Sequence, residues 1–173
     1  MIFKPSMYKK DIFSISYDKL KKMGKRVLIY DLDNTLALID QKECPKKTKD
    51  LINKLKKDFD IYIISNNNYK RILPYMNELG INGISNAIKP STRGLRKIIK
   101  EEGYKKSEMV MIGDQMVTDI LSANRFDITS ILVDPLGVKD LKITGLNRFI
   151  ESIIIKKYTK KNVFKRGKYY DRG

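Results

Sequence analysis

The chain has 173 residues, enough for one domain that buries a core without disulfides or a structural metal. Its 36 Lys and Arg against 20 Asp and Glu give a net charge of +16, which favours anionic partners. Histidine is absent, which excludes Ser-His-Asp and Cys-His catalysis and most transition-metal sites. The single cysteine, Cys44, and the lack of a long apolar run predict a cytoplasmic protein without a membrane span.

Short apolar runs alternate with helical patterns along the chain, beginning with a short helix framed by Ser16 and Gly24. We predict strands at 26–30, 61–64, 84–88, 109–112 and 130–133, and intervening helices at 46–57, 69–79, 92–102 and 117–125. A last helix at 146–157 is expected to pack its apolar residues inward: Leu146, Phe149, Ile150, Ile153 and Ile154. Strands that are apolar on both faces and separated by amphipathic helices are typical of a mainly parallel sheet. The predicted fold class is α/β, a Rossmann-like three-layer sandwich.

We expect one domain over residues 1–173, with an N-terminal extension at 1–24 that carries the short helix. The segment 158–173 reads as a basic tail in which tyrosine and phenylalanine alternate with lysine and arginine. Such a composition suits an anionic lipid surface, or RNA with bases stacked on the aromatic rings, or a solvated flexible end. The sequence leaves all three alternatives open.

Polar residues follow the ends of several predicted strands. Asp31 and Asp33 come directly after the first strand, while Ser65 and Asp114 each follow a later one. Lys89 comes after the weak strand at 84–88. Open α/β sheets bind ligands beyond the carboxyl ends of their strands, so we expect these side chains to meet at one edge of the sheet.

Four stretches in this order resemble the motifs of the haloacid dehalogenase (HAD) superfamily: "DLDNTL" from Asp31, "SNN" from Ser65, "KP" at Lys89 and "GDQMVTD" from Gly113. Together with "NR" at Asn124 they resemble, more narrowly, the YqeG-like phosphatases of subfamily IIIA, a group similar to the mitochondrial phosphatidylglycerophosphate phosphatase. The resemblance implies a HAD-like fold. The intervals 34–64 and 66–88 leave no room for a large cap domain.

The resemblance implies a phosphomonoesterase that works through an aspartyl-phosphate. Asp31 would attack phosphorus, and Asp33 would protonate the leaving oxygen and then deprotonate water. A spacing of two residues allows this division of labour only if the chain leaves extended geometry after Asp31, where Thr35 would hold the turn. Ser65 and the backbone N–H of Asn66 would bind phosphoryl oxygens.

The expected cofactor is Mg²⁺, a hard cation that takes oxygen ligands. By resemblance its ligands are Asp31, the backbone carbonyl of Asp33 and Asp114, with Asp119 acting directly or through water. Lys89 would balance the crowded carboxylates and stabilise the transferred charge.

An open crevice admits a phosphate on a large molecule. Phosphatidylglycerophosphate at the inner membrane surface is the first expectation, with the protein held there peripherally. Phosphorylated nucleic acid ends are an alternative, and a non-catalytic module that docks RNA or a ribosomal particle is another. Contacts to the leaving group would come from the loop 37–45 and from Lys70 or Arg71.

Overall fold

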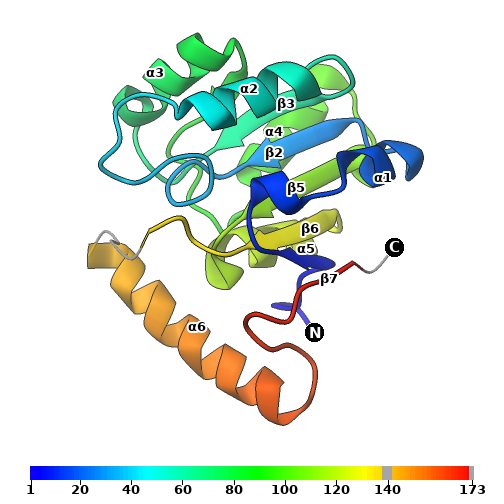
Figure 1. Ribbon diagram of the computed structural model, residues 1–173, viewed down its shortest axis with the longest axis vertical. Coiled ribbons are helices and arrows are strands. Elements are labelled where there is room, and N and C mark those ends of the chain that lie inside the picture. Colours follow the sequence, from blue (N-terminus) through cyan, green and yellow to red (C-terminus); the bar gives the residue numbers. More distant parts are fainter. Residues whose placement is uncertain (138–141, 172–173) are drawn as a thin grey trace.

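A seven-stranded sheet forms the centre of the computed structural model, which describes residues 1–137 and 142–171 (Figure 1). The strand order is β4-β3-β2-β5-β6-β1-β7. Each pair of neighbours is parallel except β1 and β7, which are antiparallel. The strands are β1 (Met7–Lys9), β2 (Val27–Tyr30), β3 (Asp60–Ile64), β4 (Asn82–Ile84), β5 (Met109–Gly113), β6 (Thr129–Val133) and β7 (Tyr170–Asp171).

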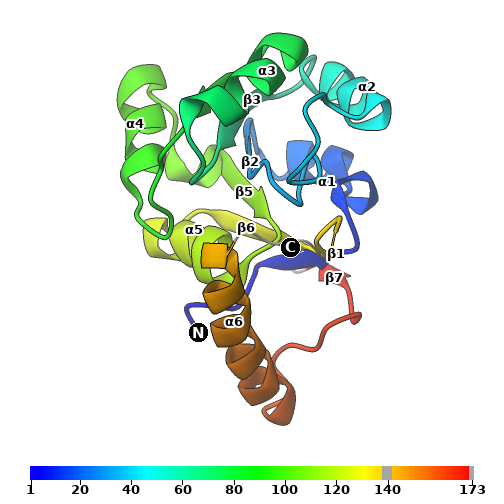
Figure 2. The ribbon, with the colours of Figure 1, turned by 90° about the vertical axis from the view of Figure 1, so that its left-hand side faces the viewer.

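Helices cover both faces of the sheet (Figure 2). Leu28 and Tyr30 of β2 pack into the core shared with the first three helices, and Val27 and Ile29 pack into the core under α4 and α5. This period of two is that of a strand buried on both faces, and it confirms the three-layer α/β fold. The helices are α1 (Tyr17–Lys22), α2 (Lys46–Leu55), α3 (Tyr69–Leu79), α4 (Arg93–Glu102), α5 (Leu121–Phe126) and α6 (Lys142–Lys160). Shorter turns are the 3-10 helices Ile12–Ser14 and Lys106–Glu108 and the π-helical turn Met116–Ile120.

Local sequence explains where the helices next to the site begin and end. The side chain of Asn68 accepts the backbone N–H of Arg71 at 3.0 Å and so caps the start of α3. Gly80 and Gly103 close α3 and α4 in the left-handed conformation, with φ of 59° and 74°. Glycine adopts this conformation without the steric cost that other residues meet.

The predicted strand at 84–88 is wrong, because β4 ends at Ile84. Beyond it the chain turns through Asn86 and Ile88, whose φ values are 48° and 52°. A β-branched residue rarely adopts positive φ, so propensity alone pointed to a strand here. The short strands β1 and β7 were also missed, because each gains its partners from a distant part of the chain.

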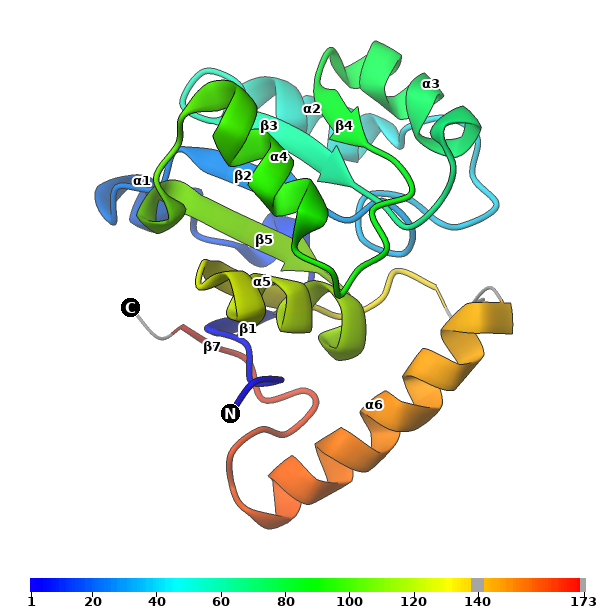
Figure 3. The same cartoon turned by 180° about the vertical axis from the view of Figure 1, so that it is seen from behind.

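Helix α6 lies at the margin of the molecule (Figure 3), and most of the residues that we predicted to pack inward face solvent. Four residues that we expected inside are exposed: Leu146 (65%), Phe149 (63%), Ile150 (40%) and Ile153 (52%). The buried side instead carries Glu151 and Tyr158, with Ile154 half-buried against them. This side is held because the Glu151 carboxylate accepts hydrogen bonds from Arg166 at 2.8 Å and Arg148 at 3.2 Å.

The described part of the expected tail is folded against the sheet. Phe164 is buried, and Tyr170 pairs with Tyr8 where β7 joins β1. Arg166 bonds to Asp134 at 2.9 Å. Residues 172 and 173 of the expected tail lie outside the described residues. Among the helices described, none is long and apolar enough to span a bilayer.

Candidate active site

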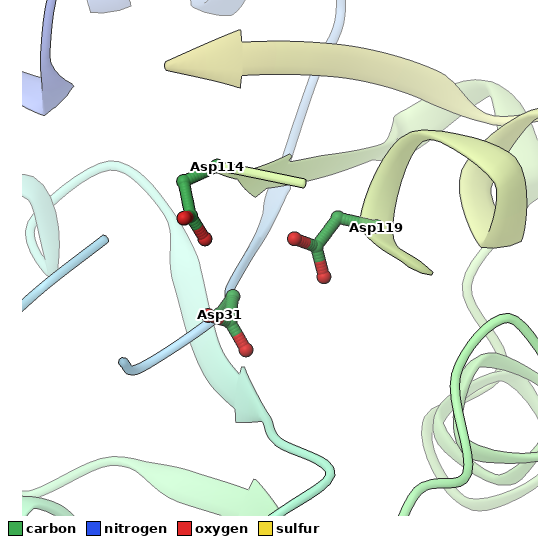
Figure 4. A group of neighbouring side chains, drawn as sticks. All are labelled: Asp31, Asp114 and Asp119. Carbon is green, nitrogen blue, oxygen red and sulfur yellow. The ribbon is translucent and has the colours of Figure 1, made fainter. Parts of the chain in front are cut away.

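Three buried carboxylates gather at the carboxyl edge of the sheet: those of Asp31, Asp114 and Asp119 (Figure 4). Asp31 follows β2 directly, Asp114 follows β5, and Asp119 lies in the π-helical turn that leads into α5. One oxygen of each lies within 4.8 Å of the others. Strands β2 and β5 are adjacent and parallel, which explains why residues far apart in sequence meet here.

The chain turns sharply after Asp31, as we predicted from the spacing of Asp31 and Asp33; the roles of the two residues stay predictions. The backbone N–H groups of Leu36 and Ala37 both donate to the carbonyl of Leu32, at 2.9 and 3.2 Å. The Thr35 hydroxyl donates to the Asp114 carboxylate at 3.3 Å. Thr35 therefore ties this turn to the end of β5.

Lys89 supplies the cation of the cluster. Its ammonium donates to Asp31 Oδ1 and Asp119 Oδ1, both at 2.6 Å, and to the Ile64 carbonyl at 2.8 Å. The side-chain amide of Asn66 fixes the Lys89 backbone by accepting its N–H at 2.6 Å and donating to its carbonyl at 3.1 Å. Ile88 has a positive φ, a strained conformation of the kind found at functional sites. Ile88 directly precedes Lys89, whose side chain enters the cluster.

Burial and mutual repulsion govern the charges of this cluster. Burial raises the pKa of Asp31 well above its usual range; the Lys89 ammonium lowers that pKa, whereas Asp119 and Asp114 raise it further. Burial raises the pKa of Asp114 to about 7, with Arg148 opposing the shift. Burial also lowers the pKa of Lys89, but the carboxylates of Asp119 and Asp31 outweigh this and hold it above its usual value. Lys89 is therefore protonated at neutral pH.

Arg148 of α6 is a second cation at the cluster that the sequence did not predict. Its guanidinium pairs with the Asp114 carboxylate through Nη2 and donates to the Asp114 carbonyl through Nη1 at 3.1 Å. It also pairs with Glu151, at 3.2 Å. No motif marks Arg148, because the contact depends on how α6 docks on the sheet.

Asp33 lies outside the carboxylate cluster and is paired with Arg71 of α3. Asp33 Oδ1 accepts from Arg71 Nη2 at 2.7 Å and from Nε at 3.0 Å, and Oδ2 accepts from the Asn67 amide at 3.2 Å. Arg71 also donates to the Leu38 carbonyl at 3.0 Å, which attaches the loop after the first motif to α3. The acid-base and leaving-group roles expected for Asp33 and Arg71 stay predictions.

Ser65 is buried at the end of β3, and its hydroxyl accepts the backbone N–H of Asn67 at 3.0 Å. It thus shapes the turn that presents Asn66 and Asn67 at the edge of the site. The side chain of Asn66 holds Lys89, a role that the sequence did not predict. Phosphate binding by Ser65 and the Asn66 N–H stays a prediction.

The cluster fits a hard divalent cation. Carboxylate oxygens are the ligands that Mg²⁺ prefers, and one or two carboxylates usually serve it. The cluster brings three carboxylates together in a buried space: Asp31, Asp114 and Asp119. Lys89 and Arg148 balance only part of their negative charge, so negative charge remains for a metal ion to balance. The side chain of Asp33 faces Arg71 instead, so only its backbone carbonyl remains as the predicted ligand.

Comparison with known proteins identifies the family. The family model described as haloacid dehalogenase-like hydrolase matches residues 3–127. The chain belongs to this family. The "Probable phosphatase YqeG" of Bacillus subtilis is 35% identical to this HAD-like hydrolase over 154 residues, covering 88% of the chain and 90% of the relative. The "Phosphatidylglycerophosphate phosphatase 1, chloroplastic/mitochondrial" of Arabidopsis thaliana is 25% identical over 170 residues. That match covers 92% of the chain but about half, 49%, of the plant protein.

Solved structures share the fold of this HAD-like hydrolase. An uncharacterized protein from Listeria monocytogenes has a TM-score of 0.54 at 20% identity, covering 67% of this chain and 84% of its own. The cobalt-bound deoxy-D-mannose-octulosonate 8-phosphate phosphatase of Haemophilus influenzae has a TM-score of 0.51 at 17% identity, covering 83% and 95%. The family and its phosphatase relatives confirm the predicted enzyme class, a phosphatase.

Proposed function

We propose that this HAD-like phosphatase is a Mg²⁺-dependent phosphomonoesterase that hydrolyses phosphatidylglycerophosphate. The observation that carries the proposal is the buried carboxylate cluster bridged by Lys89, because Asp31, the proposed nucleophile, lies beside a fixed cation there. The substrate is supported by the relatives named as phosphatidylglycerophosphate phosphatases and by the basic surface of the chain.

In the first step an oxygen of Asp31 attacks phosphorus, forming an Asp31–phosphorus bond while the bond to the leaving oxygen breaks. Anionic phosphate repels an anionic nucleophile, so a cation must lie beside the attacking carboxylate. The Lys89 ammonium, 2.6 Å from Asp31 Oδ1, meets this need and holds the side chain in place. Ser65 and the Asn66 N–H would bind phosphoryl oxygens at the end of β3.

Asp33 would take up a proton as the phosphate ester binds, would give that proton to the leaving oxygen, and would then take one from the water that breaks the aspartyl-phosphate. Its pairing with Arg71 and Asn67 holds its side chain outside the carboxylate cluster. Arg71 thereby positions the proton donor, and it could shift to the substrate when Asp33 is protonated.

Mg²⁺ would be held by Asp31, Asp114 and Asp119 with the Asp33 carbonyl, and when bound it would neutralise charge on the phosphoryl oxygens. Gln115 contributes because its backbone N–H donates to Asp119 Oδ2 at 3.1 Å, which fixes that carboxylate.

The decisive measurement is phosphate release from phosphatidylglycerophosphate in mixed micelles. We expect release with Mg²⁺, none with EDTA, and a loss of at least about a thousandfold in Asp31→Asn, since this substitution removes the nucleophile. Asp18→Asn, an exposed substitution on α1, is the matched control and keeps full activity. A soluble ester and a 5′-phosphorylated oligonucleotide are assayed in parallel. Faster hydrolysis of the oligonucleotide would replace the lipid by nucleic acid ends, and full activity of Asp31→Asn would refute the mechanism.

A further inference from the structure

Helix α6 presents its apolar side to solvent. Leu146, Phe149, Ile150 and Ile153 are all exposed, and their spacing of three and four residues places them along one stripe. Figures 1 and 3 show α6 at the margin of the molecule, with one long side facing the body. That inner side is the one that carries Glu151 and Tyr158. The stripe therefore lies on the outward side of the helix.

The same stripe becomes basic toward the end of the helix. Lys157 and Lys160 continue it at helical spacing, and Lys156 and Lys161 flank them, all exposed. A helix surface with exposed Phe, Leu and Ile beside a row of lysines is typical of helices that lie in the boundary of an anionic bilayer.

We propose that the surface formed by Leu146, Phe149, Ile150, Ile153, Lys157 and Lys160, the α6 stripe, binds an anionic lipid bilayer. The apolar side chains enter the boundary between headgroups and acyl chains, and the lysines lie among the lipid phosphates. This docking surface adds a membrane contact to the proposed function, and it rests on that function for the lipid substrate.

Charge and apolar character together select a bilayer among the possible occupants. A second copy of this chain would bring another net charge of +16 and another row of lysines against the first, which opposes association. RNA would bind the lysines but would leave the apolar half of the stripe in water, because nucleic acid affinity comes mainly from phosphate contacts. An anionic bilayer offers partners to both halves.

The stripe begins beside the catalytic carboxylates. Arg148, the neighbour of Phe149, pairs with Asp114 and donates to its carbonyl at 3.1 Å. A bilayer against the start of this helix would therefore lie on the same side of the molecule as the carboxyl edge of the sheet. Docking in this orientation would raise the local concentration of a lipid substrate without any change in the catalytic groups.

The test is co-sedimentation of the full chain with vesicles of phosphatidylcholine alone or with 30% phosphatidylglycerol, about a third of the lipid. We expect binding to the anionic vesicles and at least tenfold weaker binding to the neutral ones. Phe149→Gln should weaken anionic binding severalfold, and Phe149→Gln with Ile153→Gln at least tenfold. Met23→Gln, an exposed apolar residue at the end of α1, is the matched control and binds as the unaltered chain does.

Charge reversal tests the basic half of the stripe. Lys157→Glu with Lys160→Glu should weaken binding at least tenfold, whereas Lys22→Glu with Lys54→Glu, an equal charge change on exposed lysines of α1 and α2, should weaken it less than threefold. Thermal unfolding verifies that each variant is folded. Equal losses of vesicle binding in the two double variants would overturn the proposal, because such losses would depend on net charge alone and not on the α6 stripe.

Separate readouts distinguish failure of docking from failure of the proposed function. Phosphate release by the unaltered chain from a soluble ester such as p-nitrophenyl phosphate reports on catalysis without a bilayer. Hydrolysis of that ester without vesicle binding overturns the docking surface and leaves the phosphatase in place. The docking surface is also overturned if the Phe149 and Ile153 substitutions do not weaken vesicle binding. The same holds if those variants change from dimer to monomer while their vesicle binding stays unaltered.

Discussion

At the scale of single residues, charge balance in the buried cluster depends on Lys89. Its ammonium contacts two carboxylates at 2.6 Å, and all three side chains are largely buried. Removing one partner of a buried ion pair leaves a charge that neither water nor protein compensates, at a cost of roughly 3–5 kcal/mol.

We therefore expect Lys89→Met to lower the free energy of unfolding by about 3 kcal/mol or more in EDTA, measured by urea denaturation. Lys97→Met removes a lysine from an exposed pair with Glu101, 3.8 Å away, and should cost less than about 1 kcal/mol. Phosphate release should fall at least a hundredfold in Lys89→Met alone. Equal losses of stability in the two variants would show that Lys89 does not balance buried charge.

Gly113 is a second residue on which the cluster depends. A Cβ added here would lie 2.3 Å from Cγ of Asp119, so the carboxylate would have to move. We expect Gly113→Ala to cost about 1–3 kcal/mol and to reduce Mg²⁺-dependent hydrolysis at least tenfold. Gly145→Ala, where a Cβ meets no atom within 4 Å, is the control and should keep its activity. An active Gly113→Ala would mean that Asp119 tolerates displacement.

The motifs were sufficient to predict Asp31, Lys89 and Asp114 as neighbours. The adjacent parallel strands β2 and β5 bring Asp31 and Asp114 together, whereas Lys89 reaches them from the loop beyond β4. They could not reveal which ion pairs form. Arg71 binds Asp33 across 38 positions of sequence, and Arg148 binds Asp114 across 34. Such pairs follow from the docking of α3 and α6, which local patterns do not specify.

At the scale of elements, α6 shows why an apolar pattern can point to the wrong face. Besides the four exposed apolar residues, Ile154 and Ile155 lie toward the core, so the pattern alone offers more than one side for burial. The choice is made by Glu151, whose carboxylate bonds to Arg166 and Arg148 and accepts the Met116 backbone N–H at 3.4 Å. A buried carboxylate needs such partners, and here two of them come from beyond the helix.

The same helix is expected to tune the metal site. Arg148 holds a positive charge against Asp114, and this charge opposes a cation at the same carboxylate. Arg148→Gln should therefore tighten Mg²⁺ binding about tenfold, or ~1.4 kcal/mol, by isothermal titration calorimetry. Arg26→Gln, which removes an exposed arginine at the start of β2, should change the affinity less than twofold. Weaker binding in Arg148→Gln would instead assign Arg148 to orienting Asp114.

At the scale of the whole molecule, periodicity predicted the parallel sheet and its helical layers, because β2, β3, β5 and β6 are apolar enough to be buried on both faces. The edge beyond β6 was not predictable. Strands β1 and β7 have three and two residues, and they pair residues at the two ends of the chain, such as Met7 and Asp171. Short strands carry little pattern, and their pairing depends on contacts between distant parts of the chain.

The crowded carboxylates should also make global stability depend on pH and metal together. In the folded chain the pKa of Asp114 is raised to about 7 from its usual 3.8, mainly by burial. Between these values the folded state binds more protons than the unfolded state, so stability falls as pH rises from about 4 to about 7. The full penalty, a few kcal/mol, is present above pH 7.

Mg²⁺ should remove this penalty, because its ligands bind in the deprotonated form and it binds the folded state alone. We expect the rise in Tm on adding Mg²⁺ to EDTA-treated protein to be several degrees larger at pH 8 than at pH 5, by scanning calorimetry. Asp114→Asn tests whether Asp114 is the cause. Without Mg²⁺ this variant should be more stable than the unaltered chain at pH 8, and the difference in stability should be smaller at pH 5. The rise in Tm that Mg²⁺ causes in this variant should be small at both pH 5 and pH 8. An unaltered chain that gains more from Mg²⁺ at pH 5 would contradict metal binding at these carboxylates.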